Sequence, residues 1–352
     1  MLKISYFTIL FIFLVIISFL IYNHPKFGRL PKGDRLERIK KSPNYRNGKF
    51  QNQSITRQLT GDKNKISTMY EFLFQKKEYN KPNYPVNSIK SDLHSIPSDI
   101  NTITWFGHSS YLIQTDNKKI LVDPVFYEAS PVSFINKPFI GTDIFKAEDI
   151  PDIDYLIITH DHWDHLDFKT VTKLRNRINK IICPLGVGEH FEKWNFNPDS
   201  IIELDWNDST FLDNSHTIHC LPARHFSGRG LKSNQSLWAS FMITSKSKSI
   251  YISGDGGYDN HFKSISERFK NIDLAIMENG QYNENWKYIH LMPEDLEKAV
   301  TDINAKFLIT VHNSKFALSN HCWNEPIDNI IQFSVLNNIN LMNPIIGEIL
   351  EF

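Results

Sequence analysis

Hydrophobic and polar positions divide the chain into three parts with different patterns. The first, Ile4 to Tyr22, is a run of 19 residues without a charge. As a helix it would extend about 28 Å at ~1.5 Å per residue, close to the hydrocarbon thickness of a bilayer. A signal peptide would be followed by small residues at a cleavage site, and no such pattern follows this run. Residues 1–23 are therefore predicted to form an uncleaved, single-pass transmembrane anchor.

The second part, residues 24–99, has little periodicity and begins with many basic side chains. It is predicted to be a basic juxtamembrane arm followed by a lead-in segment. Two interpretations of residues 24–60 are open. One is a solvated tether, and the other is a segment that adheres to an anionic membrane surface, at about 1 kcal/mol per basic residue near the headgroups. The two are compatible with each other.

The third part, residues 100–352, alternates short apolar runs with amphipathic stretches. Tyr155 to Thr159 is continuously apolar until its last residue, as in a strand buried on both faces. Helices are predicted at 166–176, 258–270 and 293–303. Other strands are predicted at 103–106, 110–114, 119–122, 180–183, 209–212, 217–222, 237–244, 249–253, 274–277 and 306–311. Such alternation is typical of an α/β domain in which sheets pack between helices.

The formal net charge of zero conceals an asymmetry along the chain. Residues 1–60 hold eleven basic and two acidic residues, so they sum to +9 and residues 61–352 to −9. An acidic body argues against nucleic acid as a partner, because phosphate backbones bind basic grooves. The basic residues that follow the apolar run favour the cytoplasmic side of the cell membrane for the domain. The three cysteines cannot form a disulfide framework, and this also favours the cytoplasmic side.

The strongest chemical signal follows the apolar strand at 155–159. His160, His162, Asp164 and His165 occur within six residues. Imidazole and carboxylate groups are suitable zinc ligands, although this spacing is not that of the helical H-E-x-x-H motif. The cluster predicts a metal site in the loop after the strand.

Single candidate ligands follow three further predicted strands. His225 comes after the strand at 217–222, Asp255 lies in a glycine-rich turn after 249–253, and His312 follows 306–311. Each one alone could belong to an ordinary surface turn. Together they repeat one arrangement, with a ligand at the tip of a strand, which is how a metal site at a sheet edge is assembled.

These ligands, in this order, resemble the signature of the metallo-β-lactamase fold. The chain is most similar to the subgroup related to N-acyl-phosphatidylethanolamine-hydrolysing phospholipase D and to its bacterial membrane-associated homologues. The resemblance implies a four-layer αββα sandwich. The segments that carry the closer likeness are Trp105–Ser109, Leu121–Pro124, Pro222–Arg229 and His290–Asp295, with His24–Gly28 and Ser42–Tyr45 in the arm.

The resemblance also implies a role for each ligand around two Zn²⁺ ions, or two other divalent transition metals. One ion would be held by His160, His162 and His225, and the other by Asp164, His165 and His312, with Asp255 bridging. A hydroxide shared by the metals would be the nucleophile, since zinc lowers the pKa of bound water to near 7. Asp164 and Asp255 would help to orient it.

Four further residues are candidates for supporting roles. In the family, the residue matching His290 lies beside the phosphoryl group, where it could donate a hydrogen bond or a proton; the alternative is a surface histidine before a helix. Asp123 is expected to hydrogen-bond a ligand imidazole. His108 would line the site or fill a turn. Arg229 would pair with phosphate or form a surface salt bridge. The other seven histidines are assigned no role.

The sequence thus predicts a membrane-anchored, zinc-dependent hydrolase. Its favoured activity is a phosphodiesterase that acts on phospholipid or lipid-like substrates. Two alternatives remain: a lactonase or lactamase of the same fold that cleaves C–O or C–N bonds, and an inactive metal-binding membrane protein. The fold hosts all of these chemistries, so it cannot choose among them.

Overall fold

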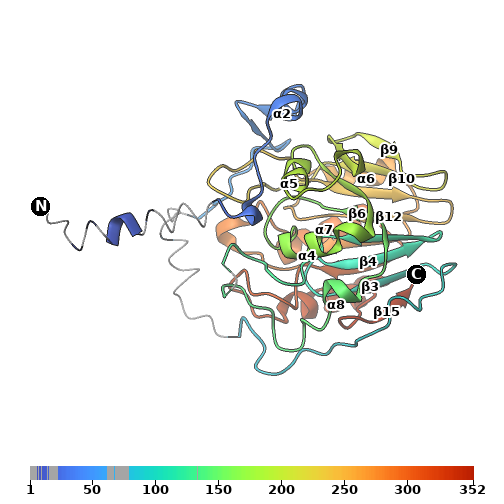
Figure 1. Ribbon diagram of the computed structural model, residues 1–352. Coiled ribbons are helices and arrows are strands. Elements are labelled where there is room, and N and C mark those ends of the chain that lie inside the picture. The colour runs from blue at the N-terminus through green and yellow to red at the C-terminus, as the bar shows by residue number, and fades with distance from the viewer. Residues whose placement is uncertain are drawn as a thin grey trace, which may run out of the picture.

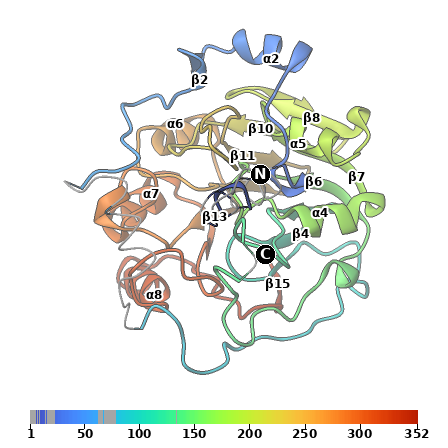
Figure 2. The same cartoon turned by 60° about the vertical axis from the view of Figure 1, so that its left-hand side comes forward.

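Two β-sheets packed face to face, with helices on their outer faces, form the body of the protein (Figure 1). The computed structural model describes residues 23–61, 79–132 and 134–352, together with positions 6, 8, 10–13, 15 and 67. Figure 2 shows α6, α7 and α8 on one side of the strands, and α4 and α5 on the other. This is the αββα arrangement that the sequence predicts.

The first sheet has seven strands in the order β15-β3-β4-β5-β6-β7-β8. Strands β5 to β8 are parallel, and the remaining pairs are antiparallel. The C-terminal strand thus pairs with the first strand of the sandwich. The strands are β3 (Thr102–Trp105), β4 (Tyr111–Thr115), β5 (Lys118–Val122), β6 (Ile153–Ile157), β7 (Ile178–Pro184), β8 (Ile201–Leu204) and β15 (Ile349–Glu351).

The second sheet has six strands in the order β14-β13-β12-β11-β10-β9. It is also mixed, since β12, β13 and β14 are parallel and the other pairs are antiparallel. The strands are β9 (Ser209–Phe211), β10 (Thr217–Leu221), β11 (Ser240–Thr244), β12 (Ser249–Ile252), β13 (Leu274–Glu278) and β14 (Phe307–Val311).

Alternation along the strands builds three separate apolar layers. In the first sheet Ile113 and Ile157 point into the core between the sheets, whereas their neighbours Leu112 and Leu156 point out toward the helices. In the second sheet Ile276 points into the core between the sheets, whereas its neighbours Ala275 and Met277 point toward the helices. Successive side chains on a strand face opposite sides of the sheet. Since both sides are covered here, one by the other sheet and one by helices, the central strands are continuous apolar runs in the sequence.

The helices are α2 (Gly33–Lys40), α4 (Phe168–Leu174), α5 (Gly188–Lys193), α6 (His261–Arg268), α7 (Pro293–Ile303) and α8 (Glu325–Asn337). Those predicted at 166–176 and 258–270 are shorter than expected, whereas 293–303 has the expected bounds. Helix α4 begins at Phe168 because the Asp167 side chain accepts a hydrogen bond from the backbone N–H of Lys169. Helices α2, α5 and α8 were not predicted.

The interpretation of residues 24–60 as a solvated tether is wrong. Ile39 of α2 and Phe50 of the hairpin β1 (Tyr45–Arg46) to β2 (Lys49–Phe50) are fully buried and belong to the same apolar cluster as the core between the sheets. Arg35 forms ion pairs with Glu189 and Glu203, both at 2.7 Å. The arm is therefore packed onto the acidic body, and part of its positive charge is already paired there.

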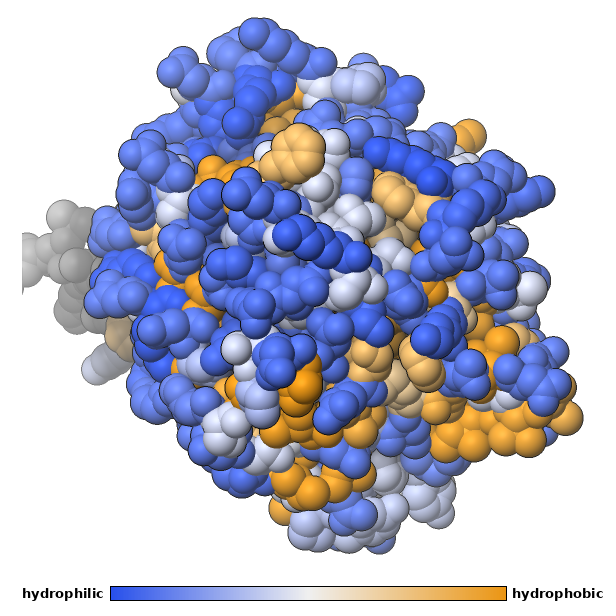
Figure 3. Space-filling model, turned by 90° about the vertical axis from the view of Figure 1, so that its right-hand side faces the viewer, coloured by the Kyte–Doolittle hydropathy of each residue, from blue (hydrophilic) through white to orange (hydrophobic). Residues whose placement is uncertain are grey.

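The predicted anchor, Ile4 to Tyr22, lies for the most part outside the described residues. Among the residues that are described, no helix is long and apolar enough to cross a bilayer. The face of the body seen in Figure 3 is mainly hydrophilic, and its hydrophobic residues form separate groups.

Candidate metal centre

The predicted ligands follow strands that all run in the same direction. In the first sheet β5 and β6 are parallel, and β3 has the same direction because it is antiparallel to β4, which is antiparallel to β5. In the second sheet β10, β12, β13 and β14 share a direction for the same reason. The carboxyl ends of these strands meet at one edge of the sandwich, and the loops that follow them carry every predicted ligand.

Three histidines form the first cluster at this edge. The His162 Nδ1 atom lies 2.9 Å from His160 Nε2 and 3.2 Å from His225 Nε2. His160 and His225 are each 1% exposed. These are the residues that the sequence assigns to one metal ion, and their nitrogens can share a single ligand sphere.

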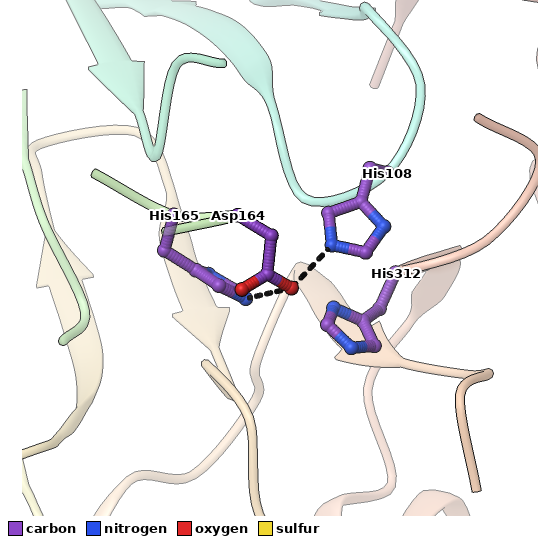
Figure 4. A group of neighbouring side chains, drawn as sticks. All are labelled: His108, Asp164, His165 and His312. Atoms are coloured by element: carbon purple, nitrogen blue, oxygen red, sulfur yellow. Dashed lines mark hydrogen bonds and ion pairs between the residues drawn. The ribbon is translucent and has the colours of Figure 1, made fainter. Parts of the chain in front are cut away.

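A second cluster contains Asp164, His165 and His312, and His108 joins it (Figure 4). The Asp164 Oδ2 atom lies 2.9 Å from His108 Nε2 and 3.6 Å from His165 Nε2. His108 occupies a left-handed turn (φ 52°) and accepts a hydrogen bond at its carbonyl from the Trp105 indole. It therefore both fills a turn and lines the site.

Asp255 lies between the two clusters. Its Oδ2 atom is 3.1 Å from His165 Nε2 and 3.9 Å from the Nε2 atoms of both His160 and His225. Its Oδ1 atom is 3.2 Å from His312 Nδ1. One carboxylate thus reaches nitrogens of both clusters, which is the position that a bridging ligand occupies.

The electrostatics of the edge favour the ligand forms of these side chains. Burial, together with neighbouring imidazoles, holds the pKa values of His160 and His225 well below 6.5. Burial opposes ionisation of Asp164 and Asp255, but attraction to His165, His312 and the other neighbouring histidines together outweighs it and lowers both pKa values. Neutral imidazoles and ionised carboxylates are the forms that bind metal.

Two buried atoms of the site that make no hydrogen bond fit a bound cation. His165 Nε2 and Asp255 Oδ1 have no hydrogen-bond partner among the described residues, although each lies within ion-pair distance of one, at 3.1 Å from Asp255 Oδ2 and 3.2 Å from His312 Nδ1. Burial lowers the pKa of His165, but attraction to Asp255, Asp164 and Asp123 raises it above 6.5. The three carboxylates thus stabilise a positive charge at this ring, which is a proton in the metal-free protein and would be replaced by a metal ion on binding. A set of imidazoles and carboxylates without cysteine suits zinc and other divalent transition metals.

Two ligand histidines are fixed through the ring nitrogen that faces away from the edge. His165 Nδ1 lies 2.7 Å from Asp123 Oδ2, and His225 Nδ1 lies 2.7 Å from the Ile289 carbonyl. In His312 the contact is on the other nitrogen, because the Nδ1 atom that faces Asp255 also lies 2.9 Å from Ser109 Oγ. Asp123 also accepts hydrogen bonds from the Thr159 N–H and hydroxyl. Such contacts orient an imidazole and set its tautomer.

Arg229 does not take either of its predicted roles. It is 4% exposed, and its guanidinium donates to the carbonyls of Lys26, Asp161 and Leu166. It also stacks on Trp163 at 4.1 Å. Its donors hold the backbone of the loop that carries His160 to His165, and they are not directed at a substrate phosphate.

His290 lies beside the first cluster, with its ring centre 5.1 Å from that of His225. Its Nδ1 atom lies 3.2 Å from Glu278 Oε2, and its side chain is 13% exposed. Burial opposes its charged form, but attraction to Glu278 and to Asp255 raises the pKa of His290 above 6.5. The surface-histidine alternative is wrong.

Sequence reasoning missed Glu278. It is the last residue of β13 and lies at the same edge of the sandwich as the ligands. Its oxygens accept hydrogen bonds from the backbone N–H groups of Gly256 (2.9 Å) and Leu291 (2.6 Å) as well as facing His290. Burial raises its pKa to about 7. Its position after a predicted strand, like that of Asp255, was the signal that could have found it.

Asp161 and His190 were also missed. Asp161 Oδ2 lies 3.0 Å from His190 Nε2 and accepts from Ser236 at 2.7 Å. His190 Nδ1 accepts from the backbone N–H of Arg29 in the arm. Since Asp161 lies between His160 and His162, this chain of contacts supports the metal-binding loop from the side of the arm.

A model of the beta-lactamase superfamily domain matches residues 118–313, which is more than half of the chain. The chain belongs to the beta-lactamase superfamily. The matched range lies within the predicted catalytic domain, residues 100–352, and contains all seven predicted ligands. The resemblance drawn from the sequence is thereby confirmed, and the His and Asp clusters at the sheet edge support a divalent-metal site in this superfamily member.

Relatives within the superfamily include an uncharacterised protein of Mycobacterium tuberculosis, 33% identical over 312 residues, which are 87% of this chain and 84% of the relative. An N-acyl-phosphatidylethanolamine-hydrolyzing phospholipase D of Caenorhabditis elegans is 32% identical over 258 residues, covering 70% of this chain and 72% of the relative. Over a shorter stretch, an outer membrane protein RomA of Klebsiella pneumoniae is 56% identical across 96 residues, 27% of this chain and 73% of RomA.

A solved structure has the same superfamily fold. Igni18, a metallo hydrolase of Ignicoccus hospitalis, has a TM-score of 0.56 with 18% identity and covers 72% of this chain and 99% of its own. At this identity the likeness shows the fold alone. The superfamily match, the relatives of more than 30% identity and the His and Asp clusters are what support a metallo-hydrolase of the beta-lactamase superfamily.

Proposed function

We propose that this metallo-hydrolase is a membrane-anchored phosphodiesterase with two zinc ions, acting on phospholipid or lipid-like phosphodiesters. The observation that carries the proposal is the position of Asp255 between two clusters of nitrogen and oxygen ligands. Ligands arranged in this way suit a pair of ions that share one carboxylate. Relatives that are named as N-acyl-phosphatidylethanolamine-hydrolyzing phospholipases D support a phosphodiester substrate.

When bound, two divalent ions supply a water of lowered pKa as nucleophile and polarise a phosphoryl oxygen. His160, His162 and His225 would hold one ion, and Asp164, His165 and His312 the other. Because His290 Nδ1 faces Glu278, the Nε2 atom is the nitrogen left to face the substrate. A protonated His290 can donate there to a phosphoryl oxygen or to the leaving alkoxide, a general-acid contribution typically worth 10²–10⁴-fold in rate.

A substrate in a lipid surface agrees with the N-terminal part of the chain. The apolar run Ile4 to Tyr22 is long enough to span a bilayer, and the arm that follows it is basic. Contact of residues 24–60 with anionic headgroups remains a proposal for those basic groups that the body does not pair. RomA, which is similar over part of the chain, is named as an outer membrane protein, whereas the basic flank favours the cytoplasmic side of the cell membrane.

The test is a metal and substrate analysis of the full chain in detergent micelles. We expect close to two zinc ions per chain and hydrolysis of both a bis-aryl phosphodiester and a phospholipid. Asp255→Ala should lose turnover and metal. Absence of bound metal would overturn the proposal, and so would full turnover by Asp255→Ala.

The same preparation separates the alternatives. Lactone or lactam hydrolysis without phosphodiester hydrolysis would assign the site to C–O or C–N cleavage. Bound metal without any hydrolysis would leave a metal-binding membrane protein. A tag at Phe352, tested for accessibility in intact cells, would decide on which side of the membrane the body lies.

A further inference from the structure

We propose that Asn52, in the N-terminal arm, is a positioning residue of the metal centre. Its side-chain amide holds the backbone of His225 in place. By doing so it raises the affinity of the cluster His160, His162 and His225 for a divalent ion. The inference rests on the proposed function only so far as that function requires a metal in this cluster.

The Asn52 amide contacts both polar groups of the His225 backbone. Its Nδ2 donates to the His225 carbonyl at 2.8 Å, and its Oδ1 accepts from the His225 N–H at 3.1 Å. The same Oδ1 accepts from the indole of Trp238, which is 1% exposed, at 3.1 Å. A planar amide that donates and accepts on one residue fixes its position in the way that a strand partner would.

His225 needs such a partner because it lies beyond the end of its strand. The pairing of β10 with β11 stops at Leu221, so the sheet offers no partner to the backbone four residues later. Buried backbone groups without a partner cost free energy, and at His225, 1% exposed, water is excluded. Asn52 of the arm supplies the hydrogen-bond partner that the sheet does not offer to His225.

The arm is held firmly enough at this point to act as a fixed support. Phe50, which is fully buried, donates its N–H to the Asn234 carbonyl at 2.9 Å. On the other side of Asn52, the Thr56 hydroxyl accepts from Arg224 Nε at 3.0 Å. Residues 50–56 therefore run along the loop that carries His225, fastened on both sides of Asn52.

The ring of His225 has an independent contact, so the two restraints can be separated. Its Nδ1 faces the Ile289 carbonyl, which sets the tautomer and the ring plane. Asn52 fixes only the backbone. Loss of Asn52 should therefore weaken one ligand cluster without disturbing Asp164, His165 and His312 directly.

The experiment compares Asn52→Ala and Asn52→Asp with the wild-type full chain in detergent micelles. Asp keeps the acceptor and the size of Asn but places a second oxygen against the His225 carbonyl. Asn44→Ala is the matched control, because this arm side chain donates to Asp205, outside the metal clusters. Each protein is stripped of metal and titrated with Zn²⁺ in competition with a chromophoric chelator.

We expect one of the two zinc equivalents to bind about 10–100-fold more weakly in both Asn52 variants, the range typical for the loss of a contact that orients a ligand. The other equivalent should bind as in the wild type. Excess zinc should restore the kcat of the variants, which a purely structural defect would not allow. The control should match the wild type in both sites.

Wild-type affinity for both equivalents in Asn52→Ala or Asn52→Asp would overturn the proposal. Thermal melting of the metal-free proteins shows whether each variant is folded. If Asn52→Ala does not fold, Asn52→Asp still tests the proposal. Equal weakening in Asn44→Ala would overturn it as well, since the effect would then come from the arm in general. Failure of the wild type to hydrolyse phosphodiesters would count against the proposed function but would not alter the zinc titration.

Discussion

The carboxylate of Glu278 connects two parts of the site that are distant in sequence. It accepts from the N–H of Gly256, next to Asp255, and from that of Leu291, next to His290, while it also faces the ring of His290. A single buried side chain therefore fixes both the loop of Asp255, the proposed bridging ligand, and the loop of His290, the proposed proton donor.

This geometry gives a prediction at the residue scale. His290→Ala should lower kcat by about 10²–10⁴-fold, as expected for a lost proton donor, whereas zinc content stays near that of the wild type. Glu278→Gln should lower kcat by about 10–100-fold, because the amide can no longer accept at both oxygens. Steady-state kinetics on a bis-aryl phosphodiester, with the exposed His94→Ala as control, measures both. Unchanged kcat in His290→Ala would return this residue to a structural role.

Lys315 is a buried cation close to the site but outside both clusters. Its Nζ donates to the carbonyls of Phe106 and Val125, both at 3.0 Å, and lies between the rings of Phe126 and Phe316. Burial lowers its pKa to about 7. Since a neutral amine keeps two N–H donors, both hydrogen bonds survive deprotonation.

The lowered pKa predicts a pH dependence of stability. Between about pH 7 and pH 10.5 the unfolded chain binds the Lys315 proton and the folded chain does not, so stability rises with pH in this window. Relative to Lys315→Met, the wild type should gain about 2–3 kcal/mol in free energy of unfolding from pH 6.5 to 9.5. Denaturant unfolding followed by tryptophan fluorescence measures the difference. A difference that is constant across this range would contradict the burial effect.

At the scale of elements, the N-terminal arm belongs to the folded body. Ile39 of helix α2 and Phe50 of the β1–β2 hairpin are fully buried in the same apolar cluster as the core between the sheets. The arm also contacts the loop of His225 directly, through Asn52. It reaches the loop of His160 and His162 indirectly, because the Arg29 N–H donates to His190, whose other ring nitrogen faces Asp161. Through these contacts the N-terminal arm is coupled to the metal-binding edge of the body.

Truncation tests this integration. Removal of residues 1–22 should leave the free energy of unfolding of the body unchanged, because none of the contacts described for the arm is lost. Removal of residues 1–60 should lower it by about 3–6 kcal/mol, since each of two fully buried side chains contributes about 1.5–3 kcal/mol. Denaturant unfolding of the two truncated proteins, compared with the full chain, gives the values. Equal stability of both truncated forms would show that the arm is dispensable.

The short elements also show where sequence patterns stop being informative. The bounds of α7 follow from Pro293 at its first turn and from its amphipathic spacing, both of which are local. Helix α5 has only six residues, too few to establish a helical period, and α8 has a weakly segregated surface. Their existence depends on packing against the sheets.

At the scale of the whole molecule, the site joins the two halves of the sandwich. His160, His162 and His165 come from the first sheet, and His225, Asp255 and His312 from the second. Ions held between them would tie the two sheets together. Metal binding should therefore stabilise the entire fold and not only the loops.

Metal removal gives the corresponding prediction. An ion present at 1,000 times its Kd contributes about 4 kcal/mol, and in a chain of this size 1 kcal/mol shifts Tm by roughly 2 °C. Treatment with a chelator should lower Tm by about 8 °C for each ion lost, and zinc should restore it. Calorimetry of the full chain, with Asp255→Ala as the variant that should respond least, provides the test. A Tm that is indifferent to chelator would contradict a metal site between the sheets.

The sequence by itself determined most strands of the two sheets, the seven candidate ligands and the family, because each of these depends on local patterns: short apolar runs, a dense His and Asp motif, and ligands directly after those runs. It missed β1, β2, β8 and β15, which are short or lie in the arm and at the end of the chain. The grouping of the ligands into two clusters, with Asp255 between them, came from the family resemblance and not from any local pattern. Neither pattern nor resemblance indicated that Arg229, Glu278 and Asn52 support the clusters. Those relations join residues tens to hundreds of positions apart, and only the pairing and stacking of two sheets brings their strand ends to one edge. The arm shows the same limit, since its charges are visible in the sequence but their partners on the body are fixed only by the packing of the folded chain.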